Sequence, residues 1–496
     1  MVFSSVFFLF GYLPVVLALY LIVPGRTKKL ALLFSSLFFY FWGENFLVWI
    51  VIASTTIDFF CALSISEGFN RREIRLLDKD RRPTVRQRAG LIVSITANLV
   101  FLGYFKYFNF FVDNVESWAE MAGLSSPFFD GFTHIALPLG ISFYTFQSMS
   151  YTIDVYRGDV RATRNFLDFS SYVTMFPQLV AGPIVRYKDI ETQLKAHRIL
   201  SSEFAEGVKR FAIGLAKKVL VANSVALAAD AAFAVPSSEL TAAVSWVGIL
   251  AYSLQIYFDF SGYSDMAIGL GLMLGFRFRE NFDFPYISQS VKEFWRRWHI
   301  SLSTWFRDYL YIPLGGGRGS TFSTYRNLVI VFLLCGFWHG AEWKFIVWGC
   351  YHGLFLVVER SGVFQSIYAR VQRPWRHVYL LMTVMIGWVF FRADDLGHAL
   401  SYLKSMALMN QGDSFAHPVA SMVSGDILFA LFVGIVFSAP VARYLRRHII
   451  ASIGEDSRVS LATFDLVQTA GLALLLMFSA MSLASGVHNP FLYFRF

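Results

Sequence analysis

The sequence predicts an all-α protein that crosses a membrane many times. Of its 496 residues, 56% are hydrophobic and 18% aromatic, while only 16% are charged; a soluble protein has about 25% charged residues. Apolar runs of membrane-spanning length recur from one end of the chain to the other, as in polytopic helical membrane proteins. None alternates every second residue, as the strands of a transmembrane β-barrel do. Because the runs repeat throughout, we expect residues 1–496 to form one membrane domain.

The charge pattern favours orientation in a membrane over nucleic-acid binding. The net charge is +9, and the Lys and Arg residues fall in loops between apolar runs rather than in one patch. Cytoplasmic loops are richer in Lys and Arg than external loops. Two expected spans separate the basic loops at 26–29 and 71–88, so both lie inside if the N-terminus is periplasmic. We therefore expect contacts with membrane lipids and no nucleic-acid partner.

The cysteines and the N-terminal residues point to no further feature. Cys61, Cys335 and Cys350 all lie in apolar runs without CxxC or other metal-ligand spacing. We interpret them as small core residues and expect no bound metal. The chain is apolar from its first residues, without the basic region or cleavage site of a signal peptide, which predicts a first span there.

The expected spans are residues 6–23, 30–42, 46–65, 91–111, 135–153, 208–233, 242–258, 345–358, 378–391, 427–442 and 464–484. Residues 169–185 form a further apolar run, which contains two prolines and is flanked by Arg164 and Arg186. Basic residues on both sides predict a re-entrant segment with both ends in the cytoplasm. The alternative is an ordinary span that is kinked at proline.

Two aspartates, Asp259 and Asp265, interrupt the otherwise apolar stretch YFDFSGYSDMAIGLG at 257–271. They either take part in chemistry or serve as helix caps or partners of Arg, and the sequence leaves these alternatives open. Gly262, Gly269, Gly271 and Gly275, in and just after this stretch, predict close approaches between helices.

Residues 291–311 predict one amphipathic helix. One face carries Phe294, Trp298, Leu302, Trp305 and Tyr309, and the other carries Glu293, Arg296, His299, Ser303 and Arg307. Such a helix is too polar to cross lipid, so it lies at the interface or plugs a cavity. We interpret it as a lid over an internal chamber, with its polar face turned inward. The alternative is a surface helix whose Arg side chains bind lipid headgroups.

The next stretch, LYIPLGGGRG at 310–319, is similar to a phosphate-binding glycine loop. It lacks the Lys-Ser/Thr pair of a Walker motif, so the match is weak. Its backbone N–H groups and Arg318 are candidates for binding an anionic donor.

Residues 328–358 predict a helix that is broken around a histidine. The runs 328–337 and 345–358 are each shorter than the ~20 residues that a bilayer needs, and WHGAEWK lies between them. Short apolar segments interrupted by glycine indicate a site inside the membrane. The break places His339 there, and an imidazole suits proton transfer near neutral pH. Glu342 either orients this histidine or faces water.

Four motifs together carry a resemblance to a known family. They are RRWHISLSTWFRDYLYIPLGG at 296–316, GFWHGAEW at 336–343, YFDFSGYSDMAIGLG at 257–271 and NPFLYFRF at 489–496. In this combination they resemble the membrane-bound O-acyltransferase family.

The resemblance implies a fold, a donor and two site residues. The family fold is a ring of tilted helices around a central tunnel. The family's catalytic histidine matches His339, and an assisting polar position matches His299. The resemblance also implies a bacterial inner membrane, acetyl-CoA as the acyl donor with no tightly bound cofactor, and periplasmic partner subunits that complete transfer to an exported polysaccharide. Alginate is the expected polymer, with peptidoglycan or cellulose as alternatives.

We therefore predict an O-acetyltransferase in which His339 is the general base on an acceptor hydroxyl. His299 would position or polarise the thioester, and the donor phosphates would bind to some of Arg296, Arg297, Arg307 and Arg318. The sequence contains no GxSxG elbow, so we assign no serine nucleophile. Two other classes stay open: a transporter or flippase, which also uses broken helices, and a non-catalytic anchoring subunit.

Overall fold

The computed structural model describes residues 2–25, 27–69, 74, 76–124, 135–195, 198–409, 412, 415–453, 458–486 and 492. Each regular element in this part of the chain is a helix. Six helical stretches among these residues are long and apolar enough to span a membrane, or seven if the bent pair Gly425–Phe437 and Val441–Ser452 forms one span. The predicted multi-pass helical class is therefore confirmed. The terminal motif NPFLYFRF lies outside the described residues except for Leu492.

The membrane-spanning stretches are Lys28–Ile65, Val85–Met121, Ser201–Phe233, Ala242–Met273, Thr321–His339 and Ala462–Ala484. Helices at other expected spans, such as α6 (Ile141–Tyr156) and α18 (Arg373–Arg392), do not meet the same length and hydropathy. Both carry buried polar side chains, for example Thr145 and Thr383, whose hydroxyls donate to backbone carbonyls of the same helix. A helix that is enclosed by protein tolerates such side chains when they have hydrogen-bond partners. The number of spans therefore cannot be obtained by counting apolar runs in the sequence.

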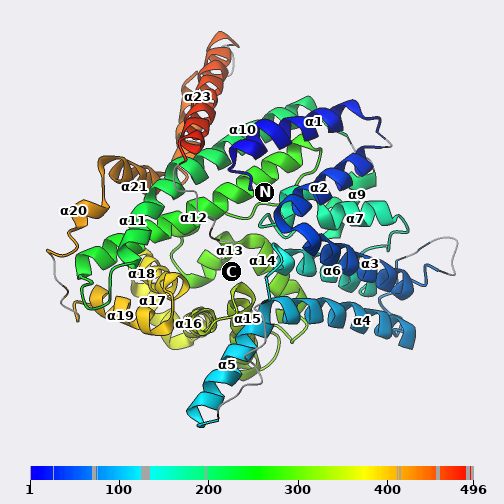
Figure 1. Ribbon diagram of the computed structural model, residues 1–496, viewed down its shortest axis with the longest axis horizontal. Helices are drawn as coiled ribbons and strands as arrows, with labels where there is room; N and C mark the ends of the chain where they lie inside the picture. The colour runs from blue at the N-terminus through cyan, green and yellow to red at the C-terminus, as the bar shows by residue number, and fades with distance from the viewer. Residues whose placement is uncertain are drawn as a thin grey trace. The chain divides into compact units, whose positions relative to one another are not determined.

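The first of two compact units comprises Met1–Val2, Phe7–Gly207 and Leu270–Arg279. Its helices are η1 (Phe8–Tyr12), α1 (Leu13–Ile22), α2 (Lys28–Glu44), η2 (Asn45–Leu47), α3 (Val48–Ile65), α4 (Val85–Leu102), η3 (Gly103–Tyr107), α5 (Phe108–Met121), α6, α7 (Phe166–Thr174), α8 (Phe176–Leu179) and α9 (Tyr187–Lys195). Figure 1 draws them in dark blue to blue-green.

A buried polar network joins three helices of this unit, α3, α4 and α6. The Asp58 carboxylate on α3 accepts hydrogen bonds from Ser94 Oγ at 2.5 Å and from Asn98 Nδ2 at 2.8 Å. Ser94 Oγ also lies 2.7 Å from Thr152 Oγ1 of α6, and all four side chains are buried. Since a buried polar group without partners is costly, this network specifies how the three helices pack.

Residues 169–185 form short helices in the same unit, α7 and α8, and a turn, all of them buried. The Tyr172 hydroxyl donates a hydrogen bond to Val185 O at 2.9 Å and so ties the two ends of the region together. Neither helix has the length of a span, so the alternative of an ordinary kinked span does not describe this region. Buried non-helical backbone of this kind is expected of a re-entrant segment, whose orientation stays a prediction.

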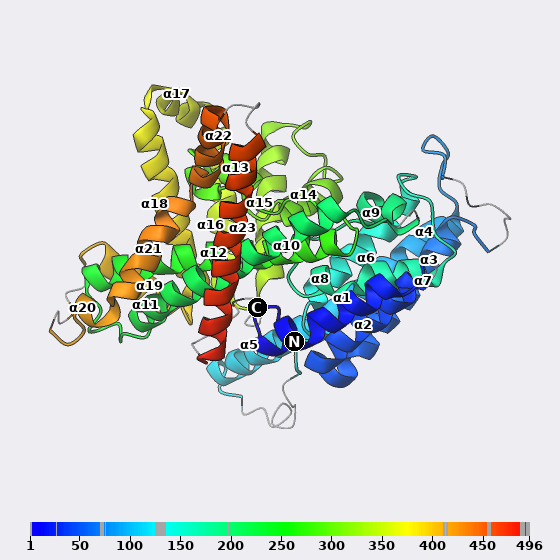
Figure 2. The same ribbon diagram turned by 90° about the horizontal axis from the view of Figure 1, so that it is seen from above.

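The second unit comprises Phe3–Val6, Val208–Gly269 and Glu280–Phe496. Its helices are most of α10 (Ser201–Ala216) and α12 (Ala242–Met273), with η4 (Lys217–Ala222), α11 (Asn223–Phe233), η5 (Pro285–Ile287), α13 (Val291–Arg297), α14 (Ile300–Phe306), η6 (Arg307–Tyr311), α15 (Thr321–His339), α16 (Trp343–Arg360), α17 (Gly362–Arg370), α18, α19 (Leu396–Met406), α20 (Val419–Met422), α21 (Gly425–Phe437), α22 (Val441–Ile453) and α23 (Arg458–Ala484). Figure 2 shows the same helices from above.

The long helix of this unit, α12, contains both aspartates of the YFDFSGYSDMAIGLG stretch. Its 32 residues continue past residue 258, where the sequence pattern predicts the end of a span. Asp259 pairs with Lys218 at 2.6 Å, and Asp265 pairs with Arg210 at 2.8 Å and with Lys217 at 2.7 Å. Pairing with cations therefore accounts for both carboxylates, because a paired charge can remain inside a helix bundle.

The predicted close approach of helices at Gly262 is confirmed. A Cβ atom on Gly262 would lie 2.7 Å from Gly214 O of α10, and a Cβ atom on Gly214 would lie 2.6 Å from Gly262 O. Since both residues lack a Cβ, the two helices cross with their backbones in contact. The crossing fixes α12, whose Phe260 packs against a histidine of the site described next.

Candidate active site

The helix that leads into the site, α13, begins at a local cap. Ser290 Oγ accepts a hydrogen bond from Glu293 N–H at 3.1 Å, and the Glu293 carboxylate accepts one from Gln289 N–H at 3.0 Å. Such capping satisfies N–H groups that the start of a helix leaves unpaired. The beginning of this helix is therefore encoded in its own sequence.

The end of α13 is not encoded in this way, and the predicted single helix over 291–311 was wrong. Trp298 is extended, and His299 has left-handed backbone angles of φ 43° and ψ 55°. A left-handed backbone costs a residue other than glycine about 1–2 kcal/mol. Two hydrogen bonds to a distant segment offset this cost: Ile300 N–H donates to Asn281 O at 2.9 Å, and Asp283 N–H donates to Arg297 O at 3.0 Å.

The break separates the residues that the helical pattern had placed on one polar face. Arg296 and Arg307 are exposed, as expected of a polar face, whereas His299 is fully buried. The apolar face survives the break: Phe294, Trp298, Leu302, Trp305 and Tyr309 are all buried. The turn at residues 298–299 therefore redirects one side chain inward while the helices on both sides keep their packing.

His299 lies in a fully buried environment in which Asn281 is a polar partner. Its Nδ1 is 3.2 Å from Asn281 Oδ1, and its ring packs edge-on against Phe260 with a centroid distance of 4.7 Å. Burial lowers the pKa of His299 to about 3, because a charged imidazolium is disfavoured away from water. The ring is therefore neutral at physiological pH.

The second histidine lies at the end of a helical hairpin formed by α15 and α16, which Figure 1 shows side by side. A Cβ atom on Gly336 would lie 2.2 Å from Phe345 O, and one on Gly349 would lie 2.3 Å from Phe332 O. Glycine is required at both positions because the two backbones are in contact. The hairpin turns at Gly340, immediately after His339.

The predicted break between the two apolar runs is present, but α15 is longer than expected. Ser320 Oγ accepts a hydrogen bond from Ser323 N–H at 3.2 Å and caps the helix well before residue 328. With 19 residues, α15 alone has the length of a membrane span. His339 is therefore the last residue of a complete helix, rather than a residue between two half-helices.

Aromatic rings surround His339. Its ring centroid is 4.9 Å from that of Trp338, 5.1 Å from that of Trp348 and 5.4 Å from that of Phe391, and only 4% of the residue is exposed. Glu342 is exposed and pairs with Lys344 at 2.9 Å. Of the two alternatives for Glu342, the structure therefore supports the one in which it faces water.

One indole ring connects the two histidines. The centroid of Trp338 is 6.2 Å from that of His299 and 4.9 Å from that of His339. The structure therefore brings together both histidines that the sequence predicts, although 40 residues separate them along the chain.

A cavity of about 380 Å³ lies between the α13–α14 segment and α15. It is lined by Lys292, Trp295, Arg296, Ile300, Leu302, Ser303, Thr304, Phe306, Arg307, Tyr311, Leu328, Val331, Phe332, Cys335 and Leu356. Its volume is that of a small-molecule site. Most of its wall is apolar, and its three cationic members, Lys292, Arg296 and Arg307, are exposed, so they mark its rim.

The α15 wall of the cavity leads toward His339. Leu328, Val331 and Cys335 line the cavity at helical spacing, and residues four apart on a helix share a face. His339 follows Cys335 by four residues, so it lies on the same face of α15, one turn beyond the last residue that lines the cavity.

Comparisons with known proteins identify the family to which the chain belongs. The sequence model described as MBOAT, membrane-bound O-acyltransferase family, matches residues 160–395. Over 518 aligned residues the chain is 43% identical to the probable alginate O-acetylase AlgI of Azotobacter vinelandii, with 100% of both chains covered. The protein belongs to the membrane-bound O-acyltransferase family.

Other members of the membrane-bound O-acyltransferase family match as well. The probable alginate O-acetylase AlgI of Pseudomonas aeruginosa is 46% identical, with 87% of this chain and 81% of the relative covered. The peptidoglycan O-acetyltransferase of Helicobacter pylori is 34% identical, with 100% and 98% covered. The protein is thus a multi-pass O-acyltransferase, as its sequence motifs predict.

The arginines predicted to bind the donor differ in their surroundings in this acyltransferase. Arg296 and Arg307 line the cavity, although Arg307 also pairs with Asp308 at 2.7 Å. Arg297 pairs with Asp283 at 3.0 Å and with Glu293 at 3.1 Å. Arg318 is exposed on the glycine loop.

Much of the backbone of the glycine loop is hydrogen-bonded within the loop. Gly315 N–H, Gly316 N–H and Arg318 N–H donate to carbonyl oxygens between residues 311 and 315, and the Asn327 side chain donates to Leu314 O at 3.0 Å. Few N–H groups are therefore turned outward, in contrast to a phosphate-binding loop.

Sequence reasoning missed three residues of the site: Asn281, Trp338 and Lys292. Asn281 lies 18 residues before His299, with no local pattern that links the two. Trp338 is adjacent to His339, and its aromatic character was the available signal. Lys292 lies one helical turn before Arg296, so the helical repeat was enough to find it.

Proposed function

We propose that this acyltransferase takes acetyl groups from cytoplasmic acetyl-CoA and passes them across the bacterial inner membrane for O-acetylation of an exported polysaccharide, alginate. The full-length similarity to probable alginate O-acetylases supports the polymer. The observation that carries the proposal is the cavity with its cationic rim, because its α15 wall, which ends at Cys335, lies on the helix face that carries His339 one turn further on.

In the proposed reaction, the cations at the rim bind the donor phosphates through charge-assisted hydrogen bonds. The acetyl thioester reaches the apolar interior beside Cys335. His339 removes the proton from an acceptor hydroxyl, whose oxygen attacks the thioester carbonyl, and the C–S bond breaks to release the CoA thiol. A general base of this kind contributes about 10²–10⁴ in rate.

The acceptor enters from the opposite side in this proposal, through the central tunnel that is expected of the family. Periplasmic partner subunits then complete transfer to the polymer, and the N-terminus of this chain is periplasmic. The basic loops on the cytoplasmic side support this orientation through the positive-inside rule.

The test compares the O-acetyl content of exported alginate in a deletion strain that carries wild-type protein or His339→Ala. We expect normal acetylation with the wild type and none with the variant, while both proteins elute as folded monodisperse species. His448→Ala is the matched control, because His448 is exposed on α22. Wild-type acetylation in the His339→Ala strain would remove His339 from the mechanism.

A second candidate acceptor is peptidoglycan, which the similarity to the Helicobacter pylori peptidoglycan O-acetyltransferase supports. Base-released acetate from purified peptidoglycan and from alginate of the same strains separates the two. A transporter or flippase would instead release no CoA thiol from acetyl-CoA when the purified protein is supplied with its partner, so thiol release distinguishes the two classes.

A further inference from the structure

Asn281 connects His299, Ser301 and Ser264 through the hydrogen bonds of its side-chain amide. It lies between α12 and α13 and is fully buried. Its Oδ1 accepts hydrogen bonds from Ser301 N–H at 3.1 Å and from Ser301 Oγ at 2.9 Å, and it lies 3.2 Å from His299 Nδ1. Its Nδ2 donates to Ser264 Oγ of α12 at 3.0 Å.

These contacts determine which end of the amide faces His299. A backbone N–H can only donate, so the atom of Asn281 that faces Ser301 N–H is the carbonyl oxygen. The same oxygen faces His299 Nδ1. A carbonyl oxygen can only accept, so the hydrogen bond requires a proton on Nδ1.

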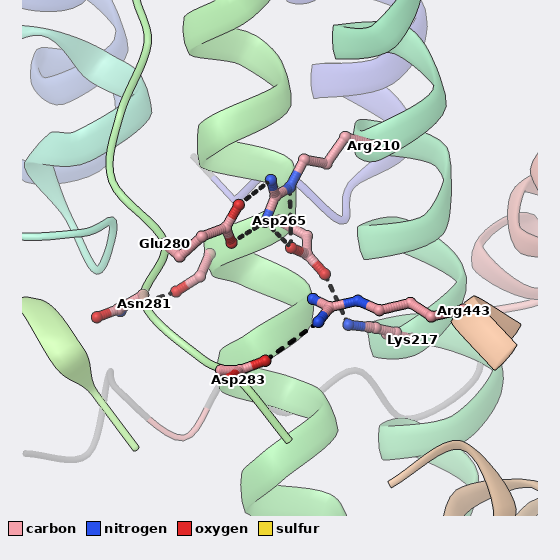
Figure 3. A network of polar contacts seen from close by, with 8 residues as sticks. Arg210, Lys217, Asp265, Glu280, Asn281, Asp283 and Arg443 are labelled. Carbon is pink, nitrogen blue, oxygen red and sulfur yellow. Dashed lines mark hydrogen bonds and ion pairs between the residues drawn. The ribbon is translucent and has the colours of Figure 1, made fainter. Parts of the chain in front are cut away.

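Ion pairs hold Asn281 in place from both sides along the chain. Figure 3 shows Glu280 beside Arg210, whose Nη1 donates to the Glu280 carboxylate at 2.6 Å, and Asp283 beside Arg443 at 3.2 Å. Arg210 also binds Asp265 of α12. The segment that carries Asn281 is therefore anchored to α10, α12 and α22, and the hydrogen bonds of its amide to Ser301 and Ser264 fix the orientation of the side chain.

We propose that Asn281 is a positioning residue that keeps the proton of His299 on Nδ1 and so makes Nε2 of His299 a hydrogen-bond acceptor. A neutral imidazole carries one N–H, and the geometry at Asn281 uses it. His299 then has no proton on Nε2 with which to polarise a thioester carbonyl, which is one of the two roles that the sequence predicts for it. Instead, Nε2 accepts a hydrogen bond from a substrate N–H or O–H group other than the hydroxyl that gives its proton to His339, and so orients the substrate for attack.

This inference rests on the proposed function for the use of His299, but the tautomer itself is measured without activity. Full-length protein labelled with ¹⁵N-histidine reports the protonated ring nitrogen through its ¹⁵N chemical shifts, and His299→Gln identifies the His299 signals by their loss. We expect the Nδ1–H form in the wild type. Detection of the Nε2–H form in the wild type would overturn the proposal, whether or not the protein transfers acetyl groups.

Steady-state kinetics with acetyl-CoA separate positioning from a purely structural role. Asn281→Leu should lower kcat about 10- to 100-fold with little change in KM, and it should lose the Nδ1–H signature. Asn281→Asp keeps an oxygen toward Nδ1 and should restore most of kcat. Ser264→Ala removes only the Nδ2 partner and should keep both kcat and the tautomer. Equal losses of kcat in Asn281→Asp and Asn281→Leu, both folded, would contradict the proposal.

Discussion

The two histidines of the site are held by opposite kinds of structure. His339 ends a regular helix, and aromatic rings and a glycine contact between two helices define its place. His299 occupies a strained break between two short helices, and hydrogen bonds and ion pairs from a distant segment define its place. The environment of His339 depends on side-chain volume, and the environment of His299 depends on hydrogen-bond and ion-pair partners. Different substitutions should therefore disrupt the two.

The largest effect should come from adding volume on the His339 side. Gly336→Ala places a Cβ 2.2 Å from Phe345 O, which forces α15 and α16 apart at a cost on the order of 3 kcal/mol. We expect little folded protein in size-exclusion profiles of the solubilised variant. Gly362→Ala is the matched control, since no atom lies within 4 Å of a Cβ there. A normal yield of Gly336→Ala would show that the hairpin tolerates separation.

The exclusion of water around His299 predicts an intermediate effect of pH. The unfolded chain protonates this histidine below about pH 6.5, whereas the folded protein resists protonation down to a pKa of about 3. The unfolded state therefore binds more protons in this window, so stability falls as the pH falls. At pH 5 the loss is about 2 kcal/mol.

Melting temperatures of wild type and His299→Gln at pH 7.5 and pH 5 test this effect. The wild type should lose more thermal stability between the two pH values than the variant does, because other histidines contribute equally to both. Identical losses would mean that His299 is solvated and that its polar environment is open to water.

The smallest expected effect is a difference in KM between variants of two neighbouring cations near the break, Arg296 and Arg297. Arg296→Ala removes an exposed cation from the cavity rim and should raise KM for acetyl-CoA about 10-fold, as expected for one charge-assisted hydrogen bond. Arg297 already pairs with Asp283 and Glu293, so Arg297→Ala should change KM less. An equal rise in KM for both variants would contradict the different roles of Arg296 and Arg297.

Much of this protein follows from its sequence. Composition gives the membrane class, since apolar runs of spanning length that repeat along a chain are typical of polytopic membrane proteins. His339 was accessible because an ionisable residue beside glycine at the end of an apolar run is rare without a function. The pairing of Asp265 with cations could be predicted from the sequence as one of two alternatives, because a carboxylate in such a helix requires a partner.

The break at His299 was not accessible in the same way. The sequence over 291–311 fits a continuous helix. The break in the helix depends on hydrogen bonds to Asn281 and Asp283, and no local sequence pattern predicts these hydrogen bonds. The length of α12 was missed for a related reason, because the partners of its aspartates lie on α10 and η4. Long-range polar contacts thus determine the structural features that local periodicity could not predict.

The glycine contact between α15 and α16 also limits how the cavity can be enlarged. Because the two backbones touch at Gly336 and Gly349, α15 cannot move closer to α16 to widen it. Extra room has to come from smaller side chains in the lining, such as Val331 on α15 or Ile300 and Leu302 on α14. A redesign for a bulkier ligand therefore changes side-chain size and leaves the backbone of the hairpin as it is.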